Sequence, residues 1–407
     1  MLLFVLLAAA GCVNDLTPDG GWSALVEDGD YLYLGNRDGH VVRVLRDSGA
    51  LDMSWRFPQS DDVGEIYGTP LISDGTLFGS GYTCRGNNCD GQIFAVDVLT
   101  GNDAWATGPY KLKTKLIGRV GLGDGVLVAG TTEIDSNDSV QGFLLALDPN
   151  ADAGLPLEQR VTSRELWRLP VDGPVWGGIE VAGSIAYFGT MKGTLYAVDL
   201  AASEQYGSDV SARVLWRFKV GGAVPGQPLV ADGKVYVGDL GNSVHALDLE
   251  SRSRDREGAA LDSATEWKFD AGGWVWGQPL LHERVLYVAN VQKGEVFALN
   301  AMNGSQVWQR PAVVEKEIVG GLVVVESSRG PALAVPSGEE DVHVVTLRDG
   351  QAAGRLDTDG RGVKSTPVVA GQVLFVHTDD GQLRQFQSST LSLVNCIEPQ
   401  GDGRRCG

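Results

Sequence analysis

The side chains that most often carry chemistry are sparse in this 407-residue chain. There are five histidines, and they show no metal-ligand spacing: His40, His245, His282, His343 and His377. Neither a Gly-x-Ser-x-Gly nucleophile elbow nor a phosphate-binding loop is present. His245 lies inside the stretch VHALD and is expected to be a packed residue in a strand.

Two polar clusters could offer oxygen ligands to a calcium ion. One contains Asp135, Asn137 and Asp138, and the other is the DTDG run from Asp357. A calcium loop needs its oxygen ligands at fixed positions around a glycine. Both clusters fail the full pattern, so we expect polar turns and no metal site.

The cysteines suggest disulfides. Cys84 and Cys89 form one closely spaced pair, expected in a loop between strands, and Cys396 and Cys406 form another; both pairs lie in polar, Gly-rich loops. A zinc site is the alternative, but neither pair has the spacing and partner histidines that zinc sites favour. We expect two local disulfides, formed in an oxidising compartment.

A pattern of turn, short strand, turn and strand recurs along the chain. Clear copies read DGDYLYLGNRDGHVVRV from Asp28, DGKVYVGDLGNSVHALD from Asp232 and AGQVLFVHTDDGQLRQF from Ala370. Eight such units, with a degenerate one from Gly320, follow each other at about 50 residues, the period of propeller blades. The strands lack polar alternation, so both sheet faces should be buried. The sequence therefore predicts an all-β, eight-bladed β-propeller of four-stranded antiparallel blades.

In a propeller, the residues that lead into each innermost strand surround one mouth of the central channel. Aligned by their distance to the following turn, they are Trp22, Tyr67, Ile117, Trp176, Pro225, Trp276 and Lys364, with Arg119 nearby. A concave aromatic mouth with a few polar groups is typical of a ligand or peptide site. The alternative is that these rings only wedge the blades together near the axis.

The stretch AVDVLTGNDAW, residues 95–105, contains the residue pattern that we expect at the end of each blade. Ala95 and Asp97 should finish the third strand, Thr100 and Gly101 make a turn, and Trp105 should lie early in the outermost strand. Asp accepts turn N–H groups, Gly supplies the positive φ, and the indole fills the gap to the next blade. Further tryptophans end altered or expanded copies: Trp167, Trp216, Trp267 and Trp308.

The pattern Ala-x-Asp-x-x-Thr-Gly-x-x-x-Trp resembles the tryptophan-docking motif of PQQ-type propeller repeats. In PQQ dehydrogenases, the mouth holds a quinone, a calcium ion and a catalytic aspartate, often with a disulfide between adjacent cysteines. This chain has no adjacent cysteines, and its mouth segments lack an Asp with Asn and Glu partners. We therefore expect neither PQQ nor calcium and no enzymatic activity, with a quinoprotein dehydrogenase as the alternative.

The first residues, MLLFVLLAAAGC, contain a short apolar run from Leu2 to Ala10, too short to span a bilayer but suited to a signal peptide. The small residues before Cys12 resemble a bacterial lipobox, which implies cleavage there and acylation of Cys12; a plain signal peptide is the alternative. The predicted organisation is a signal peptide (1–11), a lipidated tether (12–21), the propeller (22–396) and a disulfide-closed tail (397–407). The segment from Thr390 should supply the outer strand of the last blade.

A net charge of −19 without a basic run makes nucleic acid a poor partner. An acylated propeller of this repeat type resembles the BamB family of outer-membrane assembly scaffolds. That resemblance implies an exported, monomeric protein, lipid-anchored at the outer membrane and facing the periplasm. It also implies a membrane-embedded or periplasmic protein partner, such as the barrel assembly machinery itself. A propeller lipoprotein that binds a small ligand is the second hypothesis. The expanded turns of blades three to five are either an accessory surface or solvated decoration.

Overall fold

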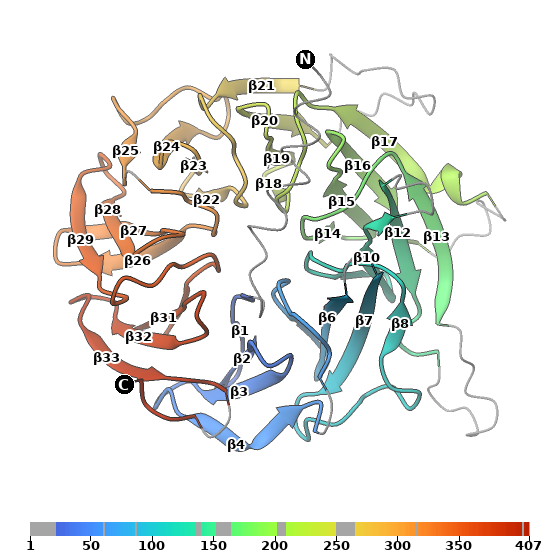
Figure 1. The fold of residues 1–407 in the computed structure, drawn as a ribbon. Coiled ribbons are helices and arrows are strands. Elements are labelled where there is room, and N and C mark those ends of the chain that lie inside the picture. Colours follow the sequence, from blue (N-terminus) through green and yellow to red (C-terminus); the bar gives the residue numbers. More distant parts are fainter. Residues whose placement is uncertain are drawn as a thin grey trace.

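Eight antiparallel sheets are arranged in a ring around a central axis (Figure 1), which confirms the predicted eight-bladed propeller. The computed structural model describes residues 22–59, 62–85, 88–134, 140–151, 164–201, 209–249, 265–314, 316–400 and 403–406. Each sheet is one blade, and its four main strands follow one another from the axis outward in chain order. Blade 3 has an additional two-residue strand, β11, which pairs with β12. The blades are numbered 1 to 8 below.

The first half of the ring contains blades 1 to 4. Blade 1 has β1 (Val26–Asp28), β2 (Tyr31–Gly35), β3 (Val41–Leu45) and β4 (Leu51–Phe57). Blade 2 has β5 (Leu71–Ser73), β6 (Thr76–Arg85), β7 (Asn88–Asp97) and β8 (Tyr110–Leu112). Blade 3 has β9 (Gly121–Gly123), β10 (Val126–Gly130), β11 (Glu133–Ile134), β12 (Val140–Leu147) and β13 (Glu165–Val171). Blade 4 has β14 (Glu180–Ala182), β15 (Ile185–Gly189), β16 (Thr194–Asp199), the short 3-10 helix η3 (Val210–Arg213) and β17 (Val214–Lys219).

The second half contains blades 5 to 8. Blade 5 has β18 (Leu229–Ala231), β19 (Lys234–Gly238), β20 (Ser243–Asp248) and β21 (Thr265–Asp270). Blade 6 has β22 (Leu280–His282), β23 (Val285–Asn290), β24 (Glu295–Asn300) and β25 (Ala312–Val313). Blade 7 has β26 (Val323–Ser327), β27 (Gly330–Pro336), β28 (Val342–Thr346) and β29 (Ala352–Leu356). Blade 8 has β30 (Val368–Ala370), β31 (Val373–His377), β32 (Leu383–Gln387) and β33 (Leu393–Ile397).

Burial on both sheet faces holds the ring together. Leu32, Tyr33 and Leu34 are consecutive in β2, so they point alternately to opposite faces, yet all three are almost fully buried. The buried apolar residues form eight clusters, and each cluster joins the facing sides of two adjacent blades. The absence of polar alternation in the sequence therefore reflects blade stacking.

Tryptophans dock each blade onto the next. The indole N–H of Trp55 donates to the Val98 carbonyl of blade 2 at 2.9 Å, and Trp308 makes the same bond to Leu347 of blade 7 at 2.9 Å. The ring of Trp55 covers Gly101, where a Cβ would lie 3.2 Å from the indole. Gly101 has φ 72°, so its lack of a side chain serves both the turn and the docked ring.

The predicted position of Trp105 needs correction. It lies in the turn before β8 and not in the outermost strand, because the chain bends back through a hydrogen bond from Gly108 N–H to the Trp105 carbonyl. Trp308 likewise precedes β25, whereas Trp167, Trp216 and Trp267 lie within β13, β17 and β21. The docking role is unaffected, since Trp105 still donates its indole N–H to Pro149 of blade 3 at 2.8 Å.

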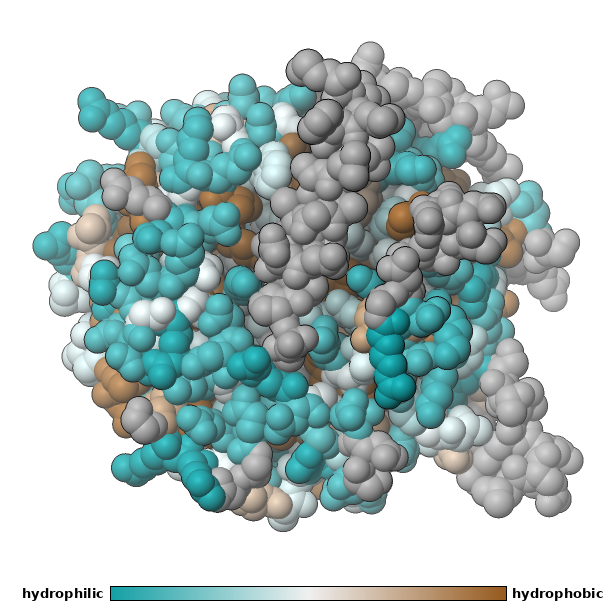
Figure 2. Space-filling model, viewed as in Figure 1, coloured by the Kyte–Doolittle hydropathy of each residue, from teal (hydrophilic) through white to brown (hydrophobic). Residues whose placement is uncertain are grey.

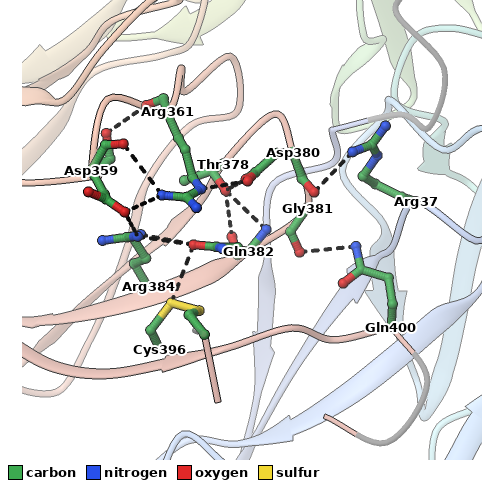
Figure 3. A network of polar contacts seen from close by, with 12 residues as sticks. Arg37, Asp359, Arg361, Thr378, Asp380, Gly381, Gln382, Arg384, Cys396 and Gln400 are labelled. Atoms are coloured by element: carbon green, nitrogen blue, oxygen red, sulfur yellow. Dashed lines mark hydrogen bonds and ion pairs between the residues drawn. A yellow bond between two sulfur atoms is a disulfide. The ribbon is translucent and has the colours of Figure 1, made fainter. Parts of the chain in front are cut away.

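The ring closes where blade 8 meets blade 1 (Figure 1), and the predicted C-terminal segment does supply the outer strand β33. Figure 3 shows the polar network at this seam. Asp380 accepts from Arg361 through its carboxylate at 2.6 Å, and its backbone carbonyl accepts from Arg37 of blade 1 at 3.0 Å. Gln385 in β32 donates to the Gly49 carbonyl of blade 1 at 2.8 Å. Side chains, rather than an exchanged strand, therefore join the two ends.

Both cysteine pairs are disulfide-bonded. Cys84 and Cys89 are not in a loop between strands, as the sequence suggested, but face each other at the ends of β6 and β7, which extend as a long hairpin. The Cys396–Cys406 bond ties the tail back onto β33. There Asn36 of blade 1 donates to the tail at Pro399 at 2.9 Å.

Candidate functional site

All eight blades contribute to one cavity at a mouth of the central channel. The residue that enters each innermost strand lines it, and in blade order these are Trp22, Tyr67, Ile117, Trp176, Pro225, Trp276, Val319 and Lys364. Arg119 lines it too, so the structure brings together all eight predicted mouth residues around a volume of about 210 Å³. Val319 escaped the sequence alignment because blade 7 is the degenerate repeat. We call this cavity the mouth.

In the sequence, a small residue directly follows each of the eight residues that enter the innermost strands. We call these eight small residues the collar: Ser23, Gly68, Gly118, Gly177, Gly226, Gly277, Gly320 and Ser365. At the six glycines of this collar, neighbouring blades approach backbone to backbone. A Cβ on Gly177 would lie 2.3 Å from the Gly226 carbonyl oxygen, and one on Gly226 would lie 2.1 Å from the Trp276 carbonyl oxygen. The collar therefore fixes the radius at which the mouth side chains are presented.

Aromatic rings form two groups around the mouth. Trp176 and Trp276 lie with ring centroids 6.4 Å apart. Across the mouth, Trp22 meets Tyr67 edge-on with centroids 4.6 Å apart, and the ammonium of Lys364 lies 5.2 Å from the Trp22 ring centre. The rings thus pack on each other and on a cation, while both groups still line the cavity.

Arg119 is the most unusual charge at the mouth. Burial lowers the pKa of its guanidinium, and the negative charge of Glu180 opposes that change. Glu180 is itself held by Gln227, which donates to its carboxylate at 2.6 Å, and burial raises the pKa of Glu180. Within the described residues, Arg119 has no ion-pair partner and its buried Nε has no hydrogen-bond acceptor. The mouth therefore contains a partly desolvated cation without a direct partner.

Tyr67 connects the mouth to a second depression. Its hydroxyl donates to Glu65 at 2.5 Å, and its ring stacks on Tyr82 with centroids 5.6 Å apart. Burial, reinforced by Glu65, raises the pKa of both tyrosines. Tyr67 is therefore a hydrogen-bond donor at neutral pH, with its hydroxyl committed to Glu65.

The second depression, about 640 Å³, lies between blades 8, 1 and 2 on the same face as the mouth. Its acidic residues include Asp38, Asp62, Glu65, Asp380 and Glu398. Arg37 also lines it and is engaged by the seam network of Figure 3. Figure 2 shows that the described surface of the face in view is mainly hydrophilic, with apolar residues in small separate patches.

The described residues contain no group of three or more His, Cys, Asp or Glu side chains placed to hold a metal ion. Asp357, in the DTDG run, accepts the backbone N–H of Asp359 in a turn, and Asp359 binds Arg361 at 2.6 Å. His245 is buried in β20 and bonds Asp239 at 3.0 Å. These groups are committed to structural contacts.

Several predicted features lie outside the described residues. They are the signal segment 1–11, Cys12 and its tether, the cluster Asp135, Asn137 and Asp138, and most of the expanded turns at 152–163, 202–208 and 250–264. Each of these turns follows the third strand of its blade and precedes the fourth, and antiparallel order places those described strand ends on the face opposite the mouth. In the part of the chain that the structure describes, no helix has the length and hydropathy needed to cross a membrane.

The sequence signal for the mouth was strong, whereas that for the docking residues was incomplete. Trp55 was missed because Arg43 and Leu45 replace the usual Ala and Asp of its repeat, and its turn is two residues longer. The pairing of β3 with β4 nevertheless places its indole like the others. A search for tryptophan alone at the end of each unit would have found it.

Comparison with known proteins agrees with this architecture. The family model described as "Outer membrane protein assembly factor BamB" matches residues 151–255, 251–356 and 292–394. The crystal structure of BamB from Moraxella catarrhalis superposes with a TM-score of 0.63 at 17% identity, covering 88% of this chain and 92% of that one. The computationally designed Ika8 protein gives a TM-score of 0.63 at 11% identity, covering 91% of this chain and 97% of its own. No curated protein sequence matches significantly. Because the family model spans more than half of its length, the chain belongs to the outer membrane protein assembly factor BamB family.

Proposed function

We propose that this protein is a non-catalytic, lipid-anchored scaffold that faces the periplasm and binds a protein partner in outer-membrane protein assembly. Family membership supports the assembly role. The observation that carries the proposal is the mouth, where six of the eight blades present an aromatic or cationic side chain on one face. Aromatic residues and arginine are the side chains enriched at protein interfaces.

The chemistry of the mouth supports a binding role over a catalytic one. Its lining contains no carboxylate and no imidazole among the described residues, and these are the side chains that most often act as general bases. Calcium takes six to eight oxygen ligands, often carboxylates, whereas the lining side chains offer only hydroxyl and amide oxygens such as those of Thr69 and Gln278. These residues do not fit a PQQ and calcium site.

The membrane anchor is part of the proposal. The apolar run before Cys12 suits export, and an acylated Cys12 would hold the propeller at the outer membrane, facing the periplasm. Replacing Cys12 with Ser should release the protein into the soluble periplasmic fraction. Fractionation that finds the Ser variant still in the membrane would contradict acylation at Cys12.

Site-specific photocrosslinking tests the partner directly. With the photoreactive residue at Trp176 or Trp276, we expect a covalent adduct to a membrane-assembly protein, identified by mass spectrometry. The matched control is Leu99, which is 80% exposed in a turn of the opposite face. An absence of adducts at both mouth positions, in protein shown to be folded, would contradict the proposal.

A further inference from the structure

The mouth contains hydrogen-bond donors that nothing in the described protein satisfies. The Nε of Arg119 and the indole Nε1 of Trp176 are both buried without an acceptor. Leaving a buried donor unpaired is destabilising, and more so when the group is charged. Two such donors lining one cavity point to an acceptor that comes from outside the protein.

The two donors lie on adjacent blades. Gly178, two residues after Trp176, packs against Arg119, since a Cβ at Gly178 would lie 3.1 Å from the Arg119 Cβ. Trp276 adds a second indole beside Trp176. A cation and an apolar aromatic surface are therefore adjacent within the mouth.

The charge of the mouth is opposite to that of the molecule. The chain carries a net charge of −19, yet the mouth is lined by two cations, Arg119 and Lys364, and by no acidic residue among those described. A positive cavity with apolar walls attracts small anions and strengthens their contacts. Its volume of about 210 Å³ is below the range typical for drug-sized ligands, about 300–1,000 Å³.

We propose that the mouth is a binding site for a small organic carboxylate, with its charged group at Arg119 and its apolar body against the indoles of Trp176 and Trp276. Arg119 offers several N–H donors in one plane, which matches the geometry of a carboxylate. The carboxylate could belong to a free acid or to an acidic side chain of a peptide. The site does not depend on the assembly role, because it rests on the unpaired donors and the charge of the cavity.

Ligand-observed NMR on the full chain tests for carboxylate binding with two probes. Benzoate represents a free acid, and the dipeptide Phe-Glu, capped at both termini, represents an acidic side chain of a peptide. We expect saturable binding of at least one of them, and at least about 10-fold weaker binding of the neutral analogue benzamide. Binding of benzoate alone identifies a free acid as the source, and binding of the dipeptide alone identifies a peptide.

Three variants assign the binding to the mouth. Arg119→Gln should weaken carboxylate binding by about 10-fold or more, whereas Arg348→Gln, at a residue with 92% side-chain exposure, should not change it. Glu180→Gln should tighten binding, because it removes the negative charge that opposes an anion at Arg119. This gain keeps the test informative even if Arg119→Gln impairs folding.

Three results would overturn the proposal: no saturable binding of either carboxylate, equal binding of benzamide, or affinities unchanged in both Arg119→Gln and Glu180→Gln. The crosslinking result is independent of these, so the scaffold and the carboxylate site can fail separately.

Discussion

Among the residues that join the blades, one pair exchanges its two positions. At three interfaces a tryptophan covers the turn glycine of the next blade, as Trp308 covers Gly350. Between blades 7 and 8, Gly354 takes the tryptophan position and Leu391 takes the glycine position, where it has φ 59°. A Cβ on Gly354 would lie 2.3 Å from the Leu391 side chain, so the leucine fills the space of the missing indole.

This exchange predicts non-additive mutations. Gly354→Trp alone should destabilise the protein by about 2 kcal/mol or more, because the indole would collide with Leu391. The double variant Gly354→Trp with Leu391→Gly should recover at least half of that loss, since it restores the pair found at other interfaces. Urea unfolding of the four proteins of the cycle measures the coupling. Additive effects would show that the two positions do not share one space.

His377 makes the seam between blades 8 and 1 sensitive to acid. It is fully buried in β31, and its Nδ1–H donates to the Ser23 carbonyl at 2.9 Å. Burial lowers the pKa of His377, with Arg37 adding to this and Asp380 opposing it. The folded protein therefore binds the proton less readily than the unfolded chain, so this stability is complete above the ordinary pKa of about 6.5 and declines below it.

The prediction is a change in the slope of stability against pH. Between pH 7.5 and 5.5, the wild-type protein should lose more free energy of unfolding than His377→Asn, which can still donate to Ser23 but cannot be protonated. The carboxylates shared by both proteins cancel in this comparison. Parallel slopes would mean that His377 does not oppose protonation in the folded state.

Among the secondary-structure elements, burial on both sheet faces determines which segments form strands. The collar glycines determine how close to the axis the mouth residues lie. The glycines were visible in the stretches VWGG, VPGQ and VWGQ, but their spacing alone could not show that each backbone touches the next blade. Such a contact depends on the closed ring, which no single repeat contains. The apolar clusters between adjacent blades could be predicted from the sequence, because the strands of the repeats lack polar alternation.

A collar substitution should therefore be costly. Gly226→Ala places a methyl group 2.1 Å from the Trp276 carbonyl oxygen, so we expect a loss of about 2 kcal/mol or more. Gly221→Ala is the control, because its nearest atom would lie 3.4 Å away and no positive φ is involved. Denaturant unfolding compares the two. Equal stabilities would show that the blades separate easily at the collar.

Across the whole ring, the last blade meets the first at a single seam, and the C-terminal tail folds over it. Gln400 of the tail donates to the Gly381 carbonyl of blade 8 at 3.1 Å, and Gly403 lies against Leu51 of blade 1. The sequence indicated the closing strand and the disulfide that follows it. It could not indicate the polar contacts at the seam, because their partners are more than 300 residues apart.

Removing the tail disulfide should weaken ring closure specifically. Cys396→Ser with Cys406→Ser should lower the free energy of unfolding by about 2 kcal/mol or more and increase hydrogen exchange in β4 and β33. Cys84→Ser with Cys89→Ser is the matched control, because that bond lies within one hairpin away from the seam. Faster exchange in the control at the same strands, or none in the first variant, would contradict this role.

We propose that this protein meets its partner at the mouth face. Photocrosslinking at Trp276, compared with Leu99 on the opposite face, tests it most directly. We predict that Trp276 captures a membrane-assembly protein and that Leu99 does not. Capture of that protein from Leu99 with none from Trp276 would place the contact on the other face and contradict the account.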